Sequence, residues 1–318
     1  MSGKILITPK SFKNFKSTTY PLMEGKGYEI VENTSGRTMT ADEIIAVANS
    51  DVVGIIIGID PLPASVLEQC KDLIAISKYG SGMDNIDLQK AEAMGIKVKN
   101  AQGTNNVSVA ELAIGLMFSM ARNIPKITAG VKSGSWERVM GCELTGKKLG
   151  LAGGGQIGRE VAKRARGLEM SVSIYDPYLK DEAFLEKYGI ERYDSLDELL
   201  SGSDFISLHI PSTSETKHII DSKAMSLMKP GAILINTSRG ELVDEAALYE
   251  ALASRKIAGA AQDVFSSEPP EKGNRLLGLD NFVLTSHIGA YTNEAIKNMA
   301  LVSTRNLLEM LENKGEGL

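Results

Sequence analysis

The chain has 318 residues, which is long for one hydrophobic core, so we expect two domains. Its 43% apolar and 24% charged residues are ordinary for a globular protein, and a net charge of −5 without a basic stripe argues against a nucleic-acid binder. The two cysteines, Cys70 and Cys142, are far apart and only three histidines are present, so we expect neither a disulfide framework nor a metal site.

The first hundred residues alternate between strand-like and helix-like segments. The opening, MSGKILITPK, has no signal-peptide pattern, and no window reaches the roughly 18 consecutive apolar residues of a membrane helix, so we expect a cytoplasmic protein without a membrane partner. Strands are predicted at Lys4–Thr8, Tyr28–Val31, Val52–Ile57, Leu73–Ser77 and Ile96–Lys99. Helices are predicted between Ser17 and Gly25 and at Ala41–Asn49, Ala64–Cys70 and Asp87–Gly95. This alternation favours a parallel, doubly wound sheet.

A polar loop after Asn100 separates this series from a long apolar helix. Ser108 and Glu111 have the S-x-x-E spacing of a capping box, which indicates a helix start. The helix in SVAELAIGLMFSMAR is apolar on nearly every side, so it must be buried on several faces. We interpret it as a domain-crossing helix close to a dimer interface; an ordinary core helix of one domain is the alternative.

From Lys147 a second series begins with a glycine-rich turn between a strand and a helix. Gly153, Gly155 and Gly158 form a G-x-G-x-x-G, and Asp176 ends the next strand. The first glycine permits a tight turn, the second lets the backbone approach a pyrophosphate, and the third lets helix and strand pack closely. The N–H groups at the helix start favour the phosphates. Asp176 would bind a ribose 2′-OH and repel a 2′-phosphate, which favours NAD over NADP.

Each later strand is followed by polar residues. Strands are predicted at Asp204–His209, Ala232–Asn236, Ala258–Asp263 and Phe282–Ser286, and helices near Leu196–Leu200, Ser222–Leu227, Glu245–Ala253 and Asn293–Leu311. The polar groups at the strand ends are Pro211, Thr237–Arg239, Asp263 and His287. Because ligands bind outside the carboxyl ends of parallel strands, we expect these groups to converge beside the nucleotide turn. For His209, which ends a strand before a proline turn, we expect a structural or cofactor-adjacent role.

Three side chains of this region could carry chemistry. His287 can exchange a proton near neutral pH, and a carboxylate beside it, such as Glu268, would favour the charged imidazolium. Arg239 has the planar fork that suits a carboxylate. The alternatives are a structural histidine, a solvent-facing loop acid, and an arginine paired with an acid at the start of the next helix.

The motifs resemble those of a known family. GGGQIG with YDP, INTSRGELVDE, AAQDVFSSEPP and TSHIGAYTNEA are similar to segments of the NAD-dependent D-isomer-specific 2-hydroxyacid dehydrogenases, particularly the 3-phosphoglycerate dehydrogenase branch. YGSGMDNIDL and NAQGTNNVSVAEL resemble that family's substrate loop and interdomain entry. The resemblance implies an α/β protein with two doubly wound parallel sheets. In it a Rossmann NAD-binding domain, residues 100–288, is inserted in a flavodoxin-like substrate domain, residues 1–99 and 289–318. It also implies a homodimer.

The same resemblance implies which residues act. The catalytic residues would be Arg239, Glu268 and His287. The NAD contacts would be Gly153, Gly155, Gln156, Ile157, Gly158, Asp176, Ile210, Pro211, Thr237, Ser238, Arg239, Asp263, His287 and Ala290. Backbone N–H groups of Ser81 and Gly82 would bind the substrate carboxylate. NADH would deliver hydride to a 2-keto carbon while His287 protonates the oxygen, Arg239 orients the carboxylate and Glu268 tunes His287.

The chain departs from the phosphoglycerate branch at one segment. Residues 54–63, GIIIGIDPLP, have no basic residue where enzymes of that branch place an arginine. Lys10, Ser11 or Lys13 of the loop TPKSFKNFK is our candidate to bind an anionic tail, either a phosphate or a second carboxylate. Lys78, which precedes the substrate loop, is a further candidate. Lysines that only solvate the loop are the alternative.

Three functions therefore stay open. The first is an enzyme similar to D-3-phosphoglycerate dehydrogenase, and the second a hydroxypyruvate or glyoxylate reductase. The third, of a different class, is a non-enzymatic NAD-sensing protein similar to the family's corepressors. The intact arginine, glutamate and histidine favour an enzyme.

Overall fold

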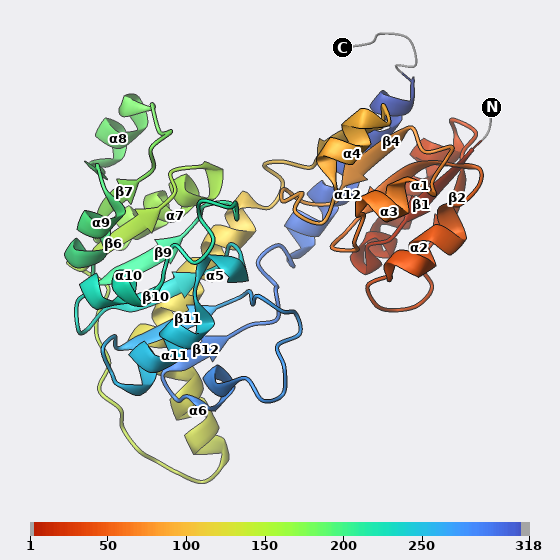
Figure 1. The fold of residues 1–318 in the computed structure, drawn as a ribbon. Coiled ribbons are helices and arrows are strands. Elements are labelled where there is room, and N and C mark those ends of the chain that lie inside the picture. Colours follow the sequence, from red (N-terminus) through yellow and green to blue (C-terminus); the bar gives the residue numbers. More distant parts are fainter. Residues whose placement is uncertain (1–2, 313–318) are drawn as a thin grey trace. The chain divides into compact units, whose positions relative to one another are not determined.

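The structure is a computed structural model that describes residues 3–312, and its chain forms two units (Figure 1). The first unit contains the chain up to Asn105 and again from Ala290, and the second contains Asn106–Gly289. Each unit is built on one parallel sheet, so the predicted α/β fold with two parallel sheets is confirmed. The predicted strands agree with the observed ones to within two residues.

The sheet of the first unit has the strand order β2-β1-β3-β4-β5. Its strands are β1 (Lys4–Ile7), β2 (Glu29–Glu32), β3 (Val52–Ile57), β4 (Ala75–Lys78) and β5 (Lys97–Asn100). Its helices are η1 (Lys10–Phe15), α1 (Lys16–Glu24), α2 (Ala41–Ala48), α3 (Ala64–Leu67), α4 (Leu88–Ala93) and α12 (Asn293–Glu312). Alternate residues of one strand point to opposite faces, so both faces of this apolar sheet need a cover.

The helices supply that cover. Ile5 and Ile7 of β1 belong to a core with α1 and α12, whereas Leu6 between them belongs to a core with α2, α3 and α4. The last helix of the chain therefore completes the core of the first hundred residues, and Figure 1 shows α12 beside β4.

The sheet of the second unit has the order β12-β11-β10-β9-β6-β7-β8. Its strands are β6 (Lys148–Ala152), β7 (Ser171–Tyr175), β8 (Glu191–Tyr193), β9 (Phe205–Leu208), β10 (Ile233–Asn236), β11 (Gly259–Gln262) and β12 (Phe282–Leu284). Its helices are α5 (Asn106–Ala121), α6 (Ile124–Lys132), α7 (Gln156–Gly167), α8 (Glu182–Tyr188), α9 (Leu196–Gly202), α10 (Ser222–Leu227), η2 (Gly240–Leu242), α11 (Glu245–Ala253) and η3 (Arg275–Gly278). The strand order reverses at β6, which places the glycine turn at the topological switch point where nucleotides bind.

The start of α5 differs from the prediction. The helix begins at Asn106, so Ser108 lies inside its first turn and the predicted capping box is wrong. The Ser108 hydroxyl donates to the carbonyl of Gly289 at 2.6 Å, and Glu111 pairs with Arg164 of α7 at 3.1 Å. In the described part of the chain no single helix could span a membrane; only the bent pair α5 and α6 together passes by length and composition.

Candidate active site

The glycine turn after β6 has the shape that a dinucleotide requires. Gly153 has φ +105°, and a Cβ there would lie 2.5 Å from the His209 carbonyl oxygen. A Cβ on Gly158 would lie 2.2 Å from the Gly153 carbonyl oxygen. On Gly155, by contrast, a Cβ would meet no described atom within 4 Å, so the backbone is open there to an approaching phosphate. Gly155 is also the residue before α7, whose free N–H groups suit an anion.

Asp176 follows β7 and is attached to the same turn. One carboxylate oxygen accepts from the Gly154 N–H and the other from the Tyr178 N–H, both at 2.8 Å. These bonds orient the carboxylate and leave it lone pairs for a ribose hydroxyl. At the other end of the turn, the Asn106 side-chain amide donates to Oε1 of the Gln156 side chain at 2.7 Å. The residues of this turn therefore fit NAD.

His209 packs against the glycine turn through its backbone carbonyl and does not offer a reactive group. Its Nε2 lies 2.9 Å from the Ser207 hydroxyl, and its Nδ1 is buried without a partner in the described residues. Burial lowers the pKa of His209 from 6.5 to about 4, so its ring is neutral at physiological pH. Its carbonyl touches Gly153, which makes a structural role beside the cofactor turn the one that the geometry supports.

The second histidine of this edge, His287, lies in a different environment. It follows β12 with φ +55°, and its Nδ1 lies 2.7 Å from Oε2 of Glu268. The other oxygen of Glu268 accepts from the Phe265 N–H at 3.0 Å. Burial raises the pKa of Glu268, but the hydrogen bond and charge of His287, with the charge of Arg239, outweigh it and hold this pKa below its usual value. The pair therefore joins a carboxylate to a ring that keeps Nε2 for proton exchange.

Asp263 fixes the loop that carries His287. It is only 1% exposed, and its carboxylate accepts from the Thr285 hydroxyl and from the N–H groups of Ile288 and Gly289. Its carbonyl accepts from the His287 N–H at 2.8 Å. These bonds position His287 through its backbone; the predicted contact of Asp263 with NAD stays a prediction.

Arg239 is placed by a close backbone contact that the sequence analysis did not single out. A Cβ on Gly240 would lie 1.9 Å from the carbonyl carbon of Phe265, so only glycine lets the two segments touch. This contact brings Arg239 near Glu268, whose pKa responds to the arginine charge. Arg239 also donates from Nη1 to the Ser238 carbonyl at 2.7 Å. The dipeptide Arg-Gly after a strand was the signal that could have revealed Gly240.

The loops after neighbouring strands are joined along one sheet edge. The Ser238 hydroxyl donates to the Leu208 carbonyl at 2.7 Å, which links the end of β10 to the end of β9. The Asp263 N–H donates to Asn236, and the Thr285 N–H to Gln262, at 2.9 and 3.0 Å. Thr237, Ile210 and Pro211 belong to the same loops. The sequence-predicted groups therefore lie at the carboxyl ends of β9 to β12; their roles stay predictions.

The predicted substrate residues lie in the first unit. Ser81 donates from its hydroxyl to the Asn105 side chain at 3.2 Å, and its carbonyl accepts from Asn100 at 2.7 Å. Lys10 is exposed at the start of η1. Lys78 is instead 6% exposed, and its ammonium donates to the Gly58 carbonyl and to Asn85. Ala290, predicted to contact NAD, is assigned to the first unit as well.

Comparison with known proteins gives a consistent result. A sequence model of the D-isomer specific 2-hydroxyacid dehydrogenase, NAD binding domain, matches residues 114–289. The chain is 43% identical to D-3-phosphoglycerate dehydrogenase of Methanocaldococcus jannaschii, over 89% of this chain and 54% of that protein. It is 42% identical to hydroxypyruvate reductase of Thermotoga maritima, over 93% and 95% of the two chains.

A solved structure is similar over the whole chain. D-lactate dehydrogenase from Aquifex aeolicus, complexed with NAD and lactic acid, gives a TM-score of 0.83 at 28% identity and covers 98% of this chain and 100% of its own. The chain spans about half the length of the two D-3-phosphoglycerate dehydrogenases from archaea that it matches.

Proposed function

Because the chain belongs to the D-isomer specific 2-hydroxyacid dehydrogenase family, we propose that it is an NAD-dependent oxidoreductase acting on a 2-hydroxy or 2-keto acid. The observation that carries this proposal is the 2.7 Å contact between His287 Nδ1 and Glu268 Oε2, on the sheet edge that also holds Arg239 and the glycine turn. An imidazole held by a carboxylate is suited to give a proton to a carbonyl oxygen and to take it back from a hydroxyl.

Each side chain has a separate part in the proposed reaction. NAD(H), when bound at the glycine turn, supplies the acceptor or donor of hydride for C2 of the substrate. His287 Nε2 gives a proton to the keto oxygen, while Glu268 holds the ring at Nδ1 and balances its charge. The guanidinium of Arg239 pairs with the substrate carboxylate, which also accepts from the backbone N–H groups of Ser81 and Gly82.

Oxidation of NADH in the presence of a panel of 2-keto acids tests this reaction. We expect turnover of small 2-keto acids, with NADH preferred over NADPH because of Asp176. A protein that binds NADH but reduces none of the panel would contradict the proposal. That result would favour the alternative of a non-enzymatic, corepressor-like NAD sensor.

For the substrate, we propose first a D-3-phosphoglycerate dehydrogenase-like preference, with Lys10 contacting an anionic tail. What supports it is the position of Lys10 after β1, on a 3-10 helix whose Phe12 is fully buried and whose Ser11 hydroxyl lies 3.1 Å from that of Tyr79. η1 is thereby joined to the segment that leads to Ser81. The absence of a basic residue in 54–63 favours the second candidate, hydroxypyruvate or glyoxylate reduction.

The Lys10→Ala variant separates the two candidates. We expect its KM to rise about tenfold for 3-phosphohydroxypyruvate, which loses one charged contact, and to stay unchanged for glyoxylate, which has no tail. Lys71→Ala is the control, because Lys71 is an exposed lysine of the same unit that precedes β4 and so lies at the opposite edge of the sheet. If the KM of Lys10→Ala equals that of the wild type for both substrates, the reductase is the better candidate.

We also propose a homodimer formed through the second unit. Supporting it is a hollow of about 540 Å³ between α5, α6 and β12, lined by Leu112, Leu116, Pro125, Phe282 and Leu284 among others. Large apolar side chains are also exposed on these elements and on the loop after α6, namely Val107, Phe118, Ile124, Val131, Leu284, Trp136 and Met140. Large exposed apolar surface is typical of a protein interface.

Sedimentation of the Phe118→Glu and Leu284→Glu double variant tests the dimer. We expect a dimer for the wild type and a monomer for the variant, since two charges would be buried in the contact. Met94→Glu, at an exposed methionine of the first unit, is the control and should leave the dimer intact.

A cytoplasmic location also stays a proposal, which fractionation of the cells that produce the protein would test.

A further inference from the structure

The loop that carries Ser81 and Gly82 is held by a buried charged side chain. Lys78 ends β4, is 6% exposed and directs its ammonium to the Gly58 carbonyl and, at 2.6 Å, to Oδ1 of Asn85. The amide of Asn85 donates to the carbonyls of Gly58 and Asp60, at 3.1 and 2.5 Å. The start and the far end of the segment 79–85 are therefore both bonded to the loop after β3.

The far end of the segment has a second anchor. The Leu62 N–H donates to the Asn85 carbonyl at 2.7 Å, and the Asp87 N–H donates to Leu62 at 2.9 Å. Leu62 and Ile86 thereby form a parallel bridge outside the main sheet. Ser81 and Gly82 lie between the two anchors, and Gly80 before them has φ +126°, a conformation open to glycine.

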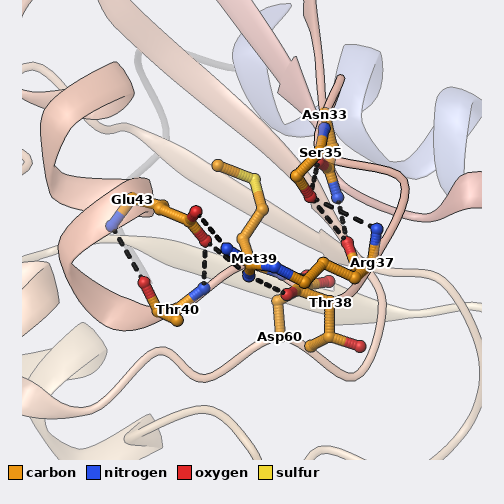
Figure 2. Close-up of polar contacts among 8 residues, drawn as sticks. All are labelled: Asn33, Ser35, Arg37, Thr38, Met39, Thr40, Glu43 and Asp60. Atoms are coloured by element: carbon orange, nitrogen blue, oxygen red, sulfur yellow. Dashed lines mark hydrogen bonds and ion pairs between the residues drawn. The ribbon is translucent and has the colours of Figure 1, made fainter.

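Asp60 extends the same network to the other strands. Its side chain is 2% exposed and accepts from the Thr8 hydroxyl and, at 2.7 Å, from the Met39 N–H. Figure 2 shows Asp60 beside Met39, at the end of the loop that leads from Asn33 to α2. The Thr8 hydroxyl in turn accepts from the Gly58 N–H at 3.0 Å. Residues after β1, β2, β3 and β4 are thus bonded to one another at the carboxyl edge of this sheet.

The charge of Lys78 makes this arrangement specific. A buried ammonium is costly unless hydrogen-bond acceptors replace its water, and two of its acceptors are the Gly58 carbonyl and Asn85. The segment 79–85 has to bring the Asn85 side chain to Gly58 for Lys78 and Asn85 to keep these hydrogen bonds. These hydrogen bonds therefore restrict the backbone positions open to Ser81 and Gly82 more than apolar packing alone would do.

We infer that Lys78 and Asn85 are positioning residues for the substrate carboxylate, because they fix the backbone N–H groups of Ser81 and Gly82 that are to bind it. The inference rests on the proposed function. It gives Lys78 a part different from the predicted direct contact with substrate: Lys78 acts through the loop. A carboxylate held equally in the ground state and the transition state contributes to KM and not to kcat.

Steady-state kinetics of Asn85→Ala and Lys78→Met test the inference. We expect KM for every 2-keto acid, glyoxylate included, to rise about tenfold, with kcat within about twofold of the wild type. The Kd of NADH, measured by fluorescence, should stay unchanged because the glycine turn belongs to the second unit. If Lys78→Met does not fold, Asn85→Ala decides alone, since Asn85 is only half-buried.

The matched control is Asn33→Ala. Asn33 also makes two amide hydrogen bonds to backbone carbonyls of the first unit, those of Thr8 and Arg37, but it lies outside the substrate loop in the chain. Figure 2 shows Asn33 beside Arg37. The Asn33→Ala substitution should lower the free energy of unfolding and leave the KM for 2-keto acids at the wild-type value. A wild-type KM in folded Asn85→Ala, or an equal rise in Asn33→Ala, overturns the inference. A wild type that reduces no 2-keto acid would instead refute the proposed function, and the inference would fail with it.

Discussion

Two histidines at the same edge of one sheet have opposite surroundings. His209 follows β9 with Nδ1 buried and Nε2 bonded to Ser207, and burial lowers its pKa to about 4. His287 follows β12, is exposed, and is bonded to the carboxylate of Glu268. Both positions satisfy the rule that ligands bind at the carboxyl ends of parallel strands. The surroundings of the ring, rather than its place in the fold, therefore distinguish the buried, neutral His209 from His287, whose ring is joined to a carboxylate.

Replacing His287 gives the largest expected effect on this comparison. We expect His287→Ala to lower kcat/KM for 2-keto acid reduction by about a thousandfold, because the keto oxygen loses its proton donor. The Kd of NADH should change little. His218→Ala, at an exposed histidine, is the control and should be as active as the wild type. Full activity of His287→Ala would break the comparison.

The pH dependence of stability tests His209. Its folded pKa of about 4 lies below the unfolded value of 6.5, so between these values the unfolded chain binds more protons and stability falls as the pH is lowered. We expect this residue to contribute a loss of about 2 kcal/mol in unfolding free energy from pH 7 to pH 5. Denaturant unfolding of His209→Gln should lack this contribution. An equal loss in the variant would show that His209 is not buried as a neutral ring.

Replacing Asp176 has a smaller expected effect on activity. It extends the comparison to the part of the sheet edge that is proposed to bind the cofactor. Asp176→Ala should lower the preference for NADH over NADPH, measured as the ratio of kcat/KM values, by about tenfold. The carboxylate also accepts from Gly154 and Tyr178, so the KM for NADH should rise as well. An unchanged ratio would contradict the assignment of Asp176 to the ribose.

The parts of the molecule that could be predicted from the sequence are those where a short motif contains the chemistry. The strand order in the chain, the glycine turn, and the placement of Arg239 and His287 at strand ends belong to this class. The family and the α/β fold are confirmed. Hydrophobic periodicity and turn residues are local, and local signals were sufficient for these features.

The parts that could not be predicted depend on contacts between distant residues. Asp60 bonds to Thr8, and Lys78 to Gly58, across 52 and 20 positions, and no motif connects them. The capping box at Ser108 failed for a related reason: its hydroxyl bonds instead to Gly289, which is 181 positions away. Helices α6 and α8 and strand β8 were not predicted, because their segments are short and most of their side chains are exposed.

The kcat of Glu268→Gln for 2-keto acid reduction at pH 7 tests the central claim most directly. The wild-type carboxylate stays ionised because its pKa is lowered, and it holds the ring of His287 at Nδ1. In the variant the neutral amide places no charge beside the ring that gives the proton, so kcat for 2-keto acid reduction at pH 7 should fall about tenfold. A kcat equal to that of the wild type would contradict proton donation by the His287–Glu268 pair.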